Sequence, residues 1–380
     1  MGPLPFRVPL RGAQLSARAD SPMRSLDSQL STVSRKVREY LLARTREQSL
    51  KPSHLDSAAR MYVQCGGKSM RPAMLLWSCS AVGGSEGEAV PAAAAVELYH
   101  TWTLVHDDII DRDERRRGGL SVHAEFEGRG ARELGLDART AAHYGLSFAI
   151  LAGDVQHAWA VGLLGRCPQA MRDPGLALRL VAELEGPVLS AIAQGEALDL
   201  QHALRPVGKV TERQILNMIS LKTAALYSFA ARAGGLLGLG SFQPRHPHVR
   251  ALAKFGRLCG MAFQLQDDIL GVLGEDKRLG KPVGSDIREG KRTTILSHAW
   301  KQASAQQRRT LSRALANPSA NDEDIRQARR ILLETGGIAH TRSLAREYVG
   351  AALEALKPVP ASDSKRLLSQ LAKAMIARTR

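Results

Sequence analysis

The sequence predicts an all-α protein, and the kinds of apolar residue it uses support this fold class. Ala and Leu, which are good helix formers, supply most of the apolar volume, whereas aromatic residues make up only 4% of the chain. Runs of Val, Ile, Tyr and Thr that are typical of strands are nearly absent. From about Leu26 onward, apolar residues recur at helical spacing almost to the end.

Turn-forming residues divide this pattern into helices of ordinary length, among them Gly83-Gly84, Gly118-Gly119 and Gly234-Gly235. The polar, glycine-containing segment 127–140 is expected to be a surface loop. No repeat or shift in composition marks a second domain, so we expect one domain over residues 26–380. Residues 1–25 are rich in Arg and poor in acids, which is typical of a disordered or targeting-like leader.

The overall charge narrows the class of partner. The chain carries 53 Lys and Arg against 37 Asp and Glu, which favours anionic partners. No nucleic-acid-binding motif is visible, so phosphorylated metabolites fit better. The four scattered cysteines indicate a reduced, cytoplasmic protein, and no apolar stretch predicts a transmembrane segment.

An acidic motif closes the first long apolar run. Residues 92–111 contain no breaker and should form one helix, in which Asp107 and Asp111 leave the same face one turn apart. Like charges at this spacing repel each other unless cations lie between them, and carboxylate oxygens are ligands that Mg²⁺ prefers. A second pair, Asp267 and Asp268, closes another apolar run. Two such helices facing each other would form a metal cage completed by phosphate oxygens.

Basic residues accompany both motifs. They are Lys68, Arg71, Arg116, Arg117, Lys222, Lys281, Lys291 and Arg292. Arg offers phosphate a bidentate fork and Lys a point charge. Their number predicts two phosphorylated ligands, one bridged to the acids by metal and one held by cations alone.

From about residue 30 to residue 360, the sequence resembles the trans-isoprenyl diphosphate synthases, or polyprenyl synthetases. The resemblance is carried by six motifs in order: GGKSMRP, His100 with His106, DDIIDRDERRRG, the KT pair, FQLQDD and GKPVGSD. It implies an all-α helical bundle around a central apolar cavity, about three Mg²⁺ ions for which Mn²⁺ can substitute, and a homodimer.

The resemblance also implies roles for individual residues. Asp107, Asp111 and Asp267 would bind the metal that clamps an allylic diphosphate, with Asp108 and Asp268 supporting them. Arg116, Lys222 and Lys281 would contact the same diphosphate. Isopentenyl diphosphate would be held by Lys68, Arg71, His100 and Arg117. Thr223 and Gln264 would line the reacting centre, and Lys291 and Arg292 would lie at the mouth.

The implied reaction is a head-to-tail, trans condensation. The allylic C–O bond ionises, the double bond of isopentenyl diphosphate attacks the carbocation, and a proton is lost to the released diphosphate. One departure stands out: the second motif, commonly DDxxD, has Gly271 at its fifth position. Glu275, Asp276 or Asp286 would have to compensate for the missing carboxylate.

Trp102 suggests the product length. It lies five residues before Asp107, so its Cα is about 7.5 Å deeper. By resemblance, a large aromatic residue here forms the pocket floor and stops elongation early. A short-chain product is therefore expected, with geranylgeranyl diphosphate favoured over farnesyl diphosphate.

Three other functions stay open. A class I terpene cyclase would not need the GGKSMRP site, and a non-catalytic subunit of a heteromeric synthase would often lack the first motif. A nucleic-acid-binding protein is the weakest alternative. Asp199 is expected to be mostly structural.

Overall fold

The computed structural model confirms the all-α fold class. It describes residues 25–168, 172–273, 285–317 and 319–377. The helices are α1 (Leu26–Arg46), α2 (Ser53–Cys65), α3 (Met70–Ala81), α4 (Glu86–Ile110), α5 (Val122–Leu134), α6 (Ala138–Leu164), α8 (Pro174–Glu183), η1 (Leu184–Val188), α9 (Leu189–Leu204), η2 (Val207–Lys209), α10 (Glu212–Ile219), η3 (Ser220–Ala224), α11 (Ala225–Leu239), α12 (Pro247–Leu273), α14 (Ser285–Arg288), α15 (Thr294–Gln302), α16 (Ala305–Ala314), α17 (Asp322–Glu334), α18 (Gly337–Ala355) and α19 (Asp363–Ala377). Within the described ranges the only strands are β1 (Arg115–Arg116) and β2 (Gly119–Leu120), a short antiparallel pair.

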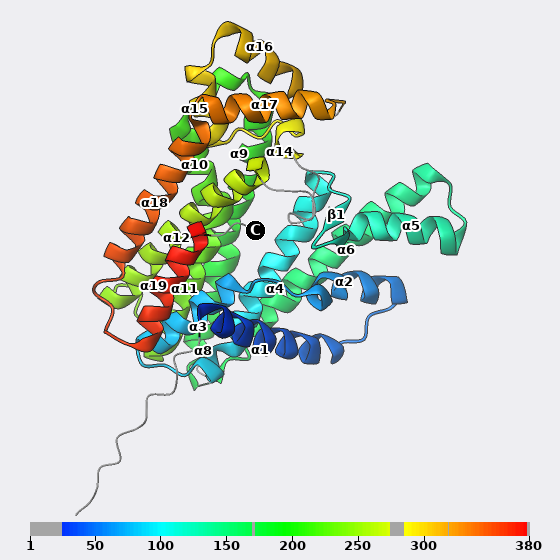
Figure 1. Ribbon diagram of the computed structural model, residues 1–380. Helices are drawn as coiled ribbons and strands as arrows, with labels where there is room; N and C mark the ends of the chain where they lie inside the picture. The colour runs from blue at the N-terminus through cyan, green and yellow to red at the C-terminus, as the bar shows by residue number, and fades with distance from the viewer. Residues whose placement is uncertain (1–24, 169–171, 274–284, 318, 378–380) are drawn as a thin grey trace, which may run out of the picture.

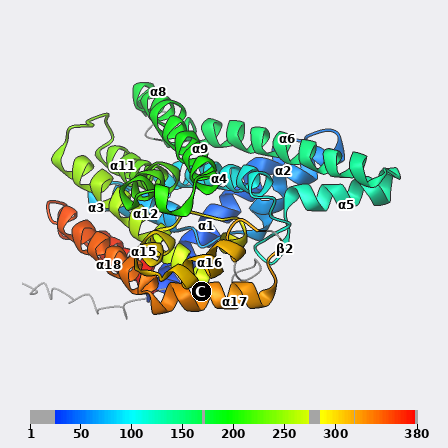
Figure 2. The ribbon, with the colours of Figure 1, turned by 90° about the horizontal axis from the view of Figure 1, so that it is seen from above.

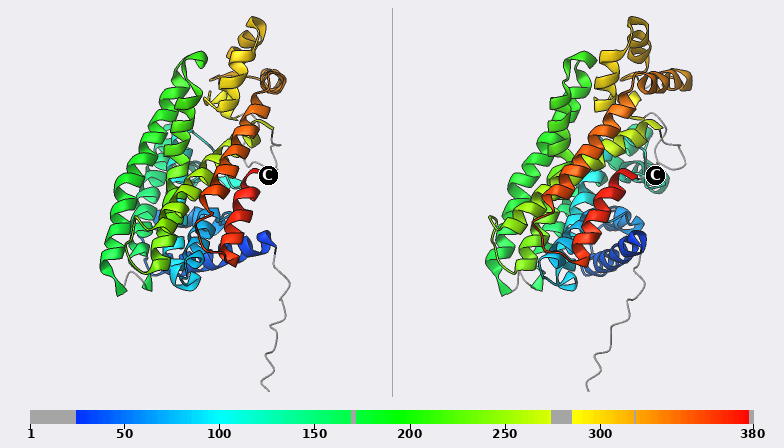
Figure 3. Two further views of the ribbon diagram at one scale, coloured as in Figure 1. Left: turned by 90° about the vertical axis from the view of Figure 1, so that its left-hand side faces the viewer. Right: turned by 60° about the vertical axis from the view of Figure 1, so that its left-hand side comes forward.

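The long helices run side by side as one bundle, and α15, α16 and α17 cover one end of it (Figures 1 and 3). α4 packs against α3 and α6, α11 lies between α3 and α12, and α12 packs on α18. α5 and α6 project to one side of the bundle beside α2 (Figures 1 and 2). The two helices that carry the acidic motifs, α4 and α12, therefore both belong to the central bundle.

Small residues let α4 sit at the centre of this bundle. Ala92 to Ala95 are all fully buried, as are Tyr99 and Leu98 further along the helix. Alanine fits between closely packed neighbouring helices and has the highest helix propensity. The predicted helix over 92–111 is confirmed, since α4 begins at Glu86 and is capped by Asp111.

The prediction of a surface loop over 127–140 was wrong. α5 continues to Leu134 and α6 begins at Ala138, so only three residues connect them. Gly135 adopts φ +66°, a left-handed conformation that suits glycine and ends α5 abruptly. The polar composition reflects the exposed face of a helical hairpin instead.

Gly234-Gly235 also does not interrupt a helix, because both residues lie inside α11. A Cβ on Gly234 would be 2.2 Å from the carbonyl oxygen of Leu75 in α3. This pair is therefore required by the close approach of two helices, not by a turn.

One helix in the described part of the chain, α6, is long and apolar enough to cross a membrane by length and composition alone. A single such helix is weak evidence, because helices of soluble proteins pass the same test. The predicted leader lies outside the described residues, and α1 begins at Leu26 after the N-cap Ser25.

Candidate active site

The first acidic motif lies at the C-terminal end of α4. Asp107 and Asp108 occupy its last turn, and the backbone N–H of the cap residue Asp111 donates to the Asp107 carbonyl oxygen at 2.8 Å. Carboxylates are unfavourable here, because the C-terminal end of a helix already carries partial negative charge. Cations from other elements are needed to stabilise this cluster.

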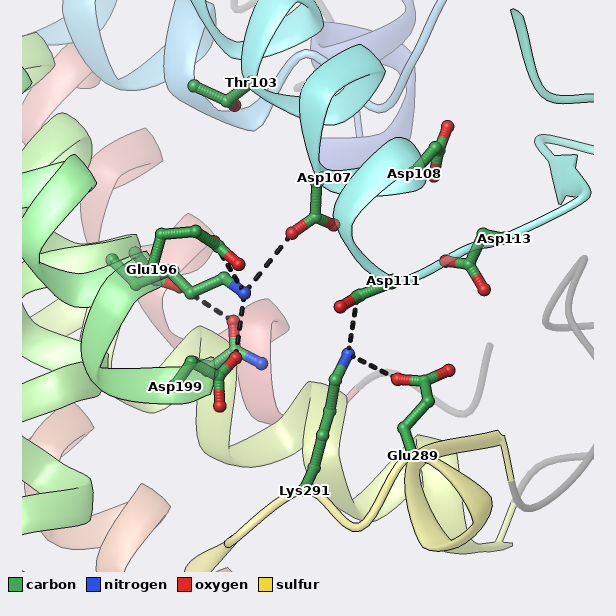
Figure 4. A network of polar contacts seen from close by, with 12 residues as sticks. Thr103, Asp107, Asp108, Asp111, Asp113, Glu196, Asp199, Glu289 and Lys291 are labelled. Carbon is green, nitrogen blue, oxygen red and sulfur yellow. Dashed lines mark hydrogen bonds and ion pairs between the residues drawn. The ribbon is translucent and has the colours of Figure 1, made fainter. Parts of the chain in front are cut away.

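Lys222 is the first of these cations. Its Nζ lies 2.8 Å from carboxylate oxygens of Glu196 and Asp199 in α9, and 3.3 Å from Asp107 (Figure 4). Burial alone would lower the pKa of Lys222, but the three carboxylates outweigh burial and raise it. Lys222 therefore stays charged and ties α9 to the end of α4.

The local backbone explains how Lys222 reaches this position. η3, which carries it, is a single π-helical turn between α10 and α11. A π-helical turn accommodates an extra residue and changes the directions of the side chains within it, and such turns are frequent at functional sites. The widened turn directs Lys222 and Thr223 into the same cavity.

Lys291 binds the opposite end of the motif. Its Nζ lies 2.9 Å from Asp111, 3.0 Å from Glu289 and 3.9 Å from Asp286 (Figure 4). Burial opposes its charge, yet the neighbouring carboxylates keep the pKa of Lys291 well above its ordinary value. Two ammonium groups thus hold the acidic motif from two sides.

Arg116, in β1, supports the motif from behind. Its guanidinium donates to Asp108 at 2.7 Å and lies 3.3 Å from Asp113 and 3.5 Å from Asp107. Asp108 is buried and also accepts from the Tyr62 hydroxyl. Burial raises the pKa of Asp108 and Arg116 opposes this rise, so this carboxylate positions Arg116.

The second acidic motif lies on α12. Thr223 donates to Gln264 Oε1 at 2.8 Å, and the Gln264 amide donates to Asp268 at 2.9 Å. Burial raises the pKa of Asp268 well above its ordinary value. These two hydrogen bonds join η3 to α12. The neighbouring Asp267 is exposed.

Gly271, the departure in the second motif, adjoins a carboxylate from elsewhere. A Cβ added at Gly271 would lie 2.3 Å from Asp286 Oδ2. Of the three acids considered as replacements, Asp286 therefore lies beside the vacant position, whereas Glu275 and Asp276 lie outside the described residues.

A cavity of about 370 Å³ brings the two motifs together. The predicted site residues that line it are Arg71, His100, Asp107, Arg116, Lys222, Thr223, Gln264, Asp267, Asp268, Lys291 and Arg292. Side chains from α4, η3 and α12, distant in sequence, thus face one space. Lys281 lies outside the described residues.

A second basic group adjoins this cavity. Arg71 is buried with its guanidinium 4.3 Å from the centre of the Tyr227 ring, and Arg117 donates to the Tyr62 carbonyl oxygen at 3.1 Å. Burial, followed by the charges of Arg71, Arg117 and Arg116, keeps the pKa of His100 well below its ordinary value. His100 is therefore neutral near pH 7 and can both donate and accept a hydrogen bond.

Glu97 was not predicted and lies between these cations. Burial raises the pKa of its carboxyl group, while Arg117 and Arg71 oppose this rise. Lys68, from the same sequence motif as Arg71, is exposed. Arg292 lines the main cavity, but its guanidinium donates to the Arg205 carbonyl oxygen at 2.8 Å.

The acids of α9 were also missed. Glu196 was not predicted, and Asp199 was expected to be mostly structural, yet both line the cavity and contact Lys222. They are three residues apart and therefore share a helix face, which was the available signal. Oxygens of Asp107, Asp111 and Glu196 lie within 4.8 Å of one another, so this cluster can hold a metal ion. An all-oxygen donor set of this kind suits Mg²⁺.

Trp102 is not among the residues that line the cavity. The α4 residues that do so are His100, Thr103, Leu104 and Asp107, which share one helix face. Trp102 follows the adjacent face, where its ring centre lies 4.8 Å from that of Tyr99.

Comparison with solved structures identifies the class of protein that this fold and site define. Geranylgeranyl pyrophosphate synthase from Corynebacterium glutamicum, solved with isoprenyl diphosphate and magnesium, superposes with a TM-score of 0.81 at 27% identity, covering 93% of this chain and 100% of that one. Geranylgeranyl pyrophosphate synthetase from Pyrococcus horikoshii gives 0.78 at 32% identity, covering 93% and 98%. The fold is that of the isoprenyl diphosphate synthases.

The family follows from the sequence comparisons. The family model for polyprenyl synthetase matches residues 52–332, so the chain belongs to the polyprenyl synthetase family. Geranylfarnesyl diphosphate synthase of Aeropyrum pernix is 35% identical, over 87% of this chain and 96% of its own. Geranylgeranyl diphosphate synthase of Saccharolobus solfataricus is 34% identical, over 85% and 90%. The protein is a trans-prenyltransferase.

Proposed function

We propose that this enzyme condenses isopentenyl diphosphate with an allylic diphosphate, head to tail, and that its main product is geranylgeranyl diphosphate. The observation that carries the proposal is the single cavity shared by Asp107, Asp267, Lys222 and Arg71. It combines a metal-binding group of acids with a separate group of cations, as two diphosphate substrates require.

The allylic diphosphate occupies the acidic side in this proposal. Asp107, Asp111 and Asp267 hold Mg²⁺, and Glu196 lies close enough to Asp107 and Asp111 to join them. Bound there, Mg²⁺ supplies positive charge that stabilises the departing diphosphate. Lys222, with Lys281 and Arg116, contributes further charge to the same leaving group.

Isopentenyl diphosphate occupies the cationic side. Lys68, Arg71 and Arg117 bind its phosphates, and the neutral His100 donates a hydrogen bond. Burial of Arg71 against Tyr227 restricts its guanidinium to one orientation, which favours a fixed position of the attacking double bond. Thr223 and Gln264, which bond to each other and line the same cavity, orient the reacting ends of both substrates.

Two observations bear on the length of the product. The relatives include both geranylgeranyl and geranylfarnesyl diphosphate synthases. In this proposal Trp102 limits the product, because its Cα lies about 7.5 Å deeper along α4 than that of Asp107 and it adjoins Thr103, which lines the cavity. Farnesyl diphosphate is the alternative product.

The test is incubation of purified protein with Mg²⁺, labelled isopentenyl diphosphate and each allylic primer, followed by sizing of the products. Asp107→Ala should lower turnover by at least about a thousandfold, and a chelator should abolish it. Allylic diphosphate turned over equally well without isopentenyl diphosphate would favour the terpene cyclase instead. A chain that is inactive alone but active with a second protein would be a subunit of a heteromeric synthase.

A homodimer in the cytoplasm completes the proposal. Leu146, Ile150 and Leu151 form an exposed apolar set on α6, with 36% to 46% of each residue accessible. A second copy covering this helix would remove that surface from water. Light scattering should give twice the chain mass, and Ile150→Glu should give monomers. The four free cysteines support a reducing compartment.

A further inference from the structure

A cluster of aromatic and polar side chains lies beside the cavity, on the face of α4 that contacts α6. The cavity is lined by Thr103 on α4 and by Ile192 on α9. Trp102 directly precedes Thr103 on the adjacent face of α4, Tyr99 lies one turn before Thr103, and Glu185 in η1 lies about two turns before Ile192. A hydrocarbon chain that grows past Thr103 and Ile192 therefore meets this cluster.

Trp102 is held on three sides. Its Nε1–H donates to His106 Nδ1 at 3.2 Å, and its ring centre lies 4.5 Å from that of His157 and 4.8 Å from that of Tyr99. His106 Nε2 faces the Ile150 carbonyl oxygen at 3.4 Å. These contacts select one tautomer, in which Nε2 carries the proton and Nδ1 accepts from Trp102.

The backbone of α6 makes room for this arrangement. A Cβ on Gly153 would lie 2.1 Å from His106 Nε2, so only glycine allows His106 to occupy its observed position. Gly153 does not line the cavity. An effect of replacing Gly153 on the reaction would therefore be indirect, through His106 and the contact between α6 and α4.

His157 is held in turn by an acid. Its Nε2 lies 2.9 Å from Glu185 Oε2. Burial raises the pKa of the Tyr99 hydroxyl, and the charge of Glu185 adds to this effect. Glu185 lies in η1, a second π-helical turn with the same widened backbone as η3.

We propose that His106, His157 and Glu185 are positioning residues that hold Trp102 and thereby limit the length of the product. The inference rests on the proposed function, because it assumes that the growing chain ends at Trp102. In an ordinary apolar floor, a longer chain is opposed only by the bulk of the aromatic ring. Here the ring is fixed by a hydrogen bond to His106 and by contact with the His157 ring, so chain extension must also break these contacts.

The experiment compares the product lengths of four variants with wild type. Gly153→Ala displaces His106 without altering any residue that lines the cavity. His157→Leu removes the ring that contacts Trp102 and its contact with Glu185, and Glu185→Gln removes only the negative charge of Glu185. Gly186→Ala, beside Glu185, is the matched control, because its added Cβ would meet no atom within 4 Å.

Each variant is incubated with Mg²⁺, isopentenyl diphosphate and an allylic primer, and the dephosphorylated products are sized by mass spectrometry. We expect the ratio of longer to wild-type product to rise about fivefold in the first three variants, as loss of one hydrogen bond implies. Gly186→Ala should match wild type. Thermal unfolding identifies any variant that does not fold, and the product lengths of the remaining variants then test the inference.

Trp102→Ala separates this inference from the function on which it rests. Longer products from Trp102→Ala but unchanged products from Gly153→Ala, His157→Leu and Glu185→Gln would overturn the inference and leave Trp102 as the floor. If Trp102→Ala itself gives unchanged products, then Trp102 does not limit the product length, and the proposed roles of His106, His157 and Glu185 are overturned as well. Failure of wild type to condense the two substrates would overturn the proposed function.

Discussion

Gly195 in α9 provides a sharp test of how the site is assembled, because it adjoins the backbone that carries Lys222. A Cβ added at Gly195 would lie 2.2 Å from the Lys222 backbone nitrogen and 2.6 Å from its Cα. Carbon atoms in contact normally lie about 3.5–4.0 Å apart. Gly195→Ala must therefore move α9 and η3 apart by more than about 1 Å.

Moving α9 and η3 apart should lower both the folding stability and the turnover of the enzyme. Lys222 contacts Glu196 and Asp199 at 2.8 Å, and these contacts hold the two elements together. Overpacking of this kind costs about 1–3 kcal/mol of folding free energy. A displacement of about 1 Å of a catalytic cation lowers the rate by about a hundredfold. We expect both effects in Gly195→Ala.

The assays are thermal unfolding and the steady-state turnover number with saturating substrates. Gly350→Ala, in the interior of α18, is the control, since its Cβ would meet nothing within 4 Å. It should be unchanged in turnover and up to about 1 kcal/mol more stable. If Gly195→Ala keeps wild-type turnover and stability, the close approach of α9 to η3 does not hold Lys222 in place.

Two further predictions concern other glycines of the site. In Gly67→Ala the new Cβ would lie 2.9 Å from Glu97 Oε1 and 3.0 Å from Arg117 Nη2. The KM for isopentenyl diphosphate should therefore rise about tenfold or more, while the KM for the allylic substrate stays near wild type. An equal rise in both KM values would contradict a separate cationic site. Gly271→Ala should push the Asp286 carboxylate aside, so half-maximal activity should need a several-fold higher Mg²⁺ concentration. If the dependence of activity on Mg²⁺ concentration is unaltered, Asp286 does not replace the missing acid.

The fold class and the centre of the site could be predicted because both depend on regular helical spacing. The unbroken run over 92–111 predicts α4, and a separation of four residues places Asp107 and Asp111 on one face. Motif order then predicted that Asp267 would share a cavity with Asp107, and both line it.

The parts that were missed depend on contacts between elements. Glu196 belongs to the site because Lys222 reaches it across a π-helical turn, and no periodicity of 3.6 residues predicts such a turn. The segment 127–140 was taken for a loop because composition does not reveal that α5 and α6 pack against each other. Gly234 was misleading, since it lies inside α11 and permits close helix packing instead of forming a turn.

The extra residue in η3 has a consequence for how the sequence of this protein can evolve. Shortening the turn by one residue would restore an ordinary α-helix through α10 and α11, which costs nothing in backbone hydrogen bonding. Because the widened turn takes up its extra residue locally, α10 and α11 would keep their orientation, but the side chains within the turn would point in other directions. Lys222 would then turn away from Asp107, so a better-formed helix would hold a disabled enzyme.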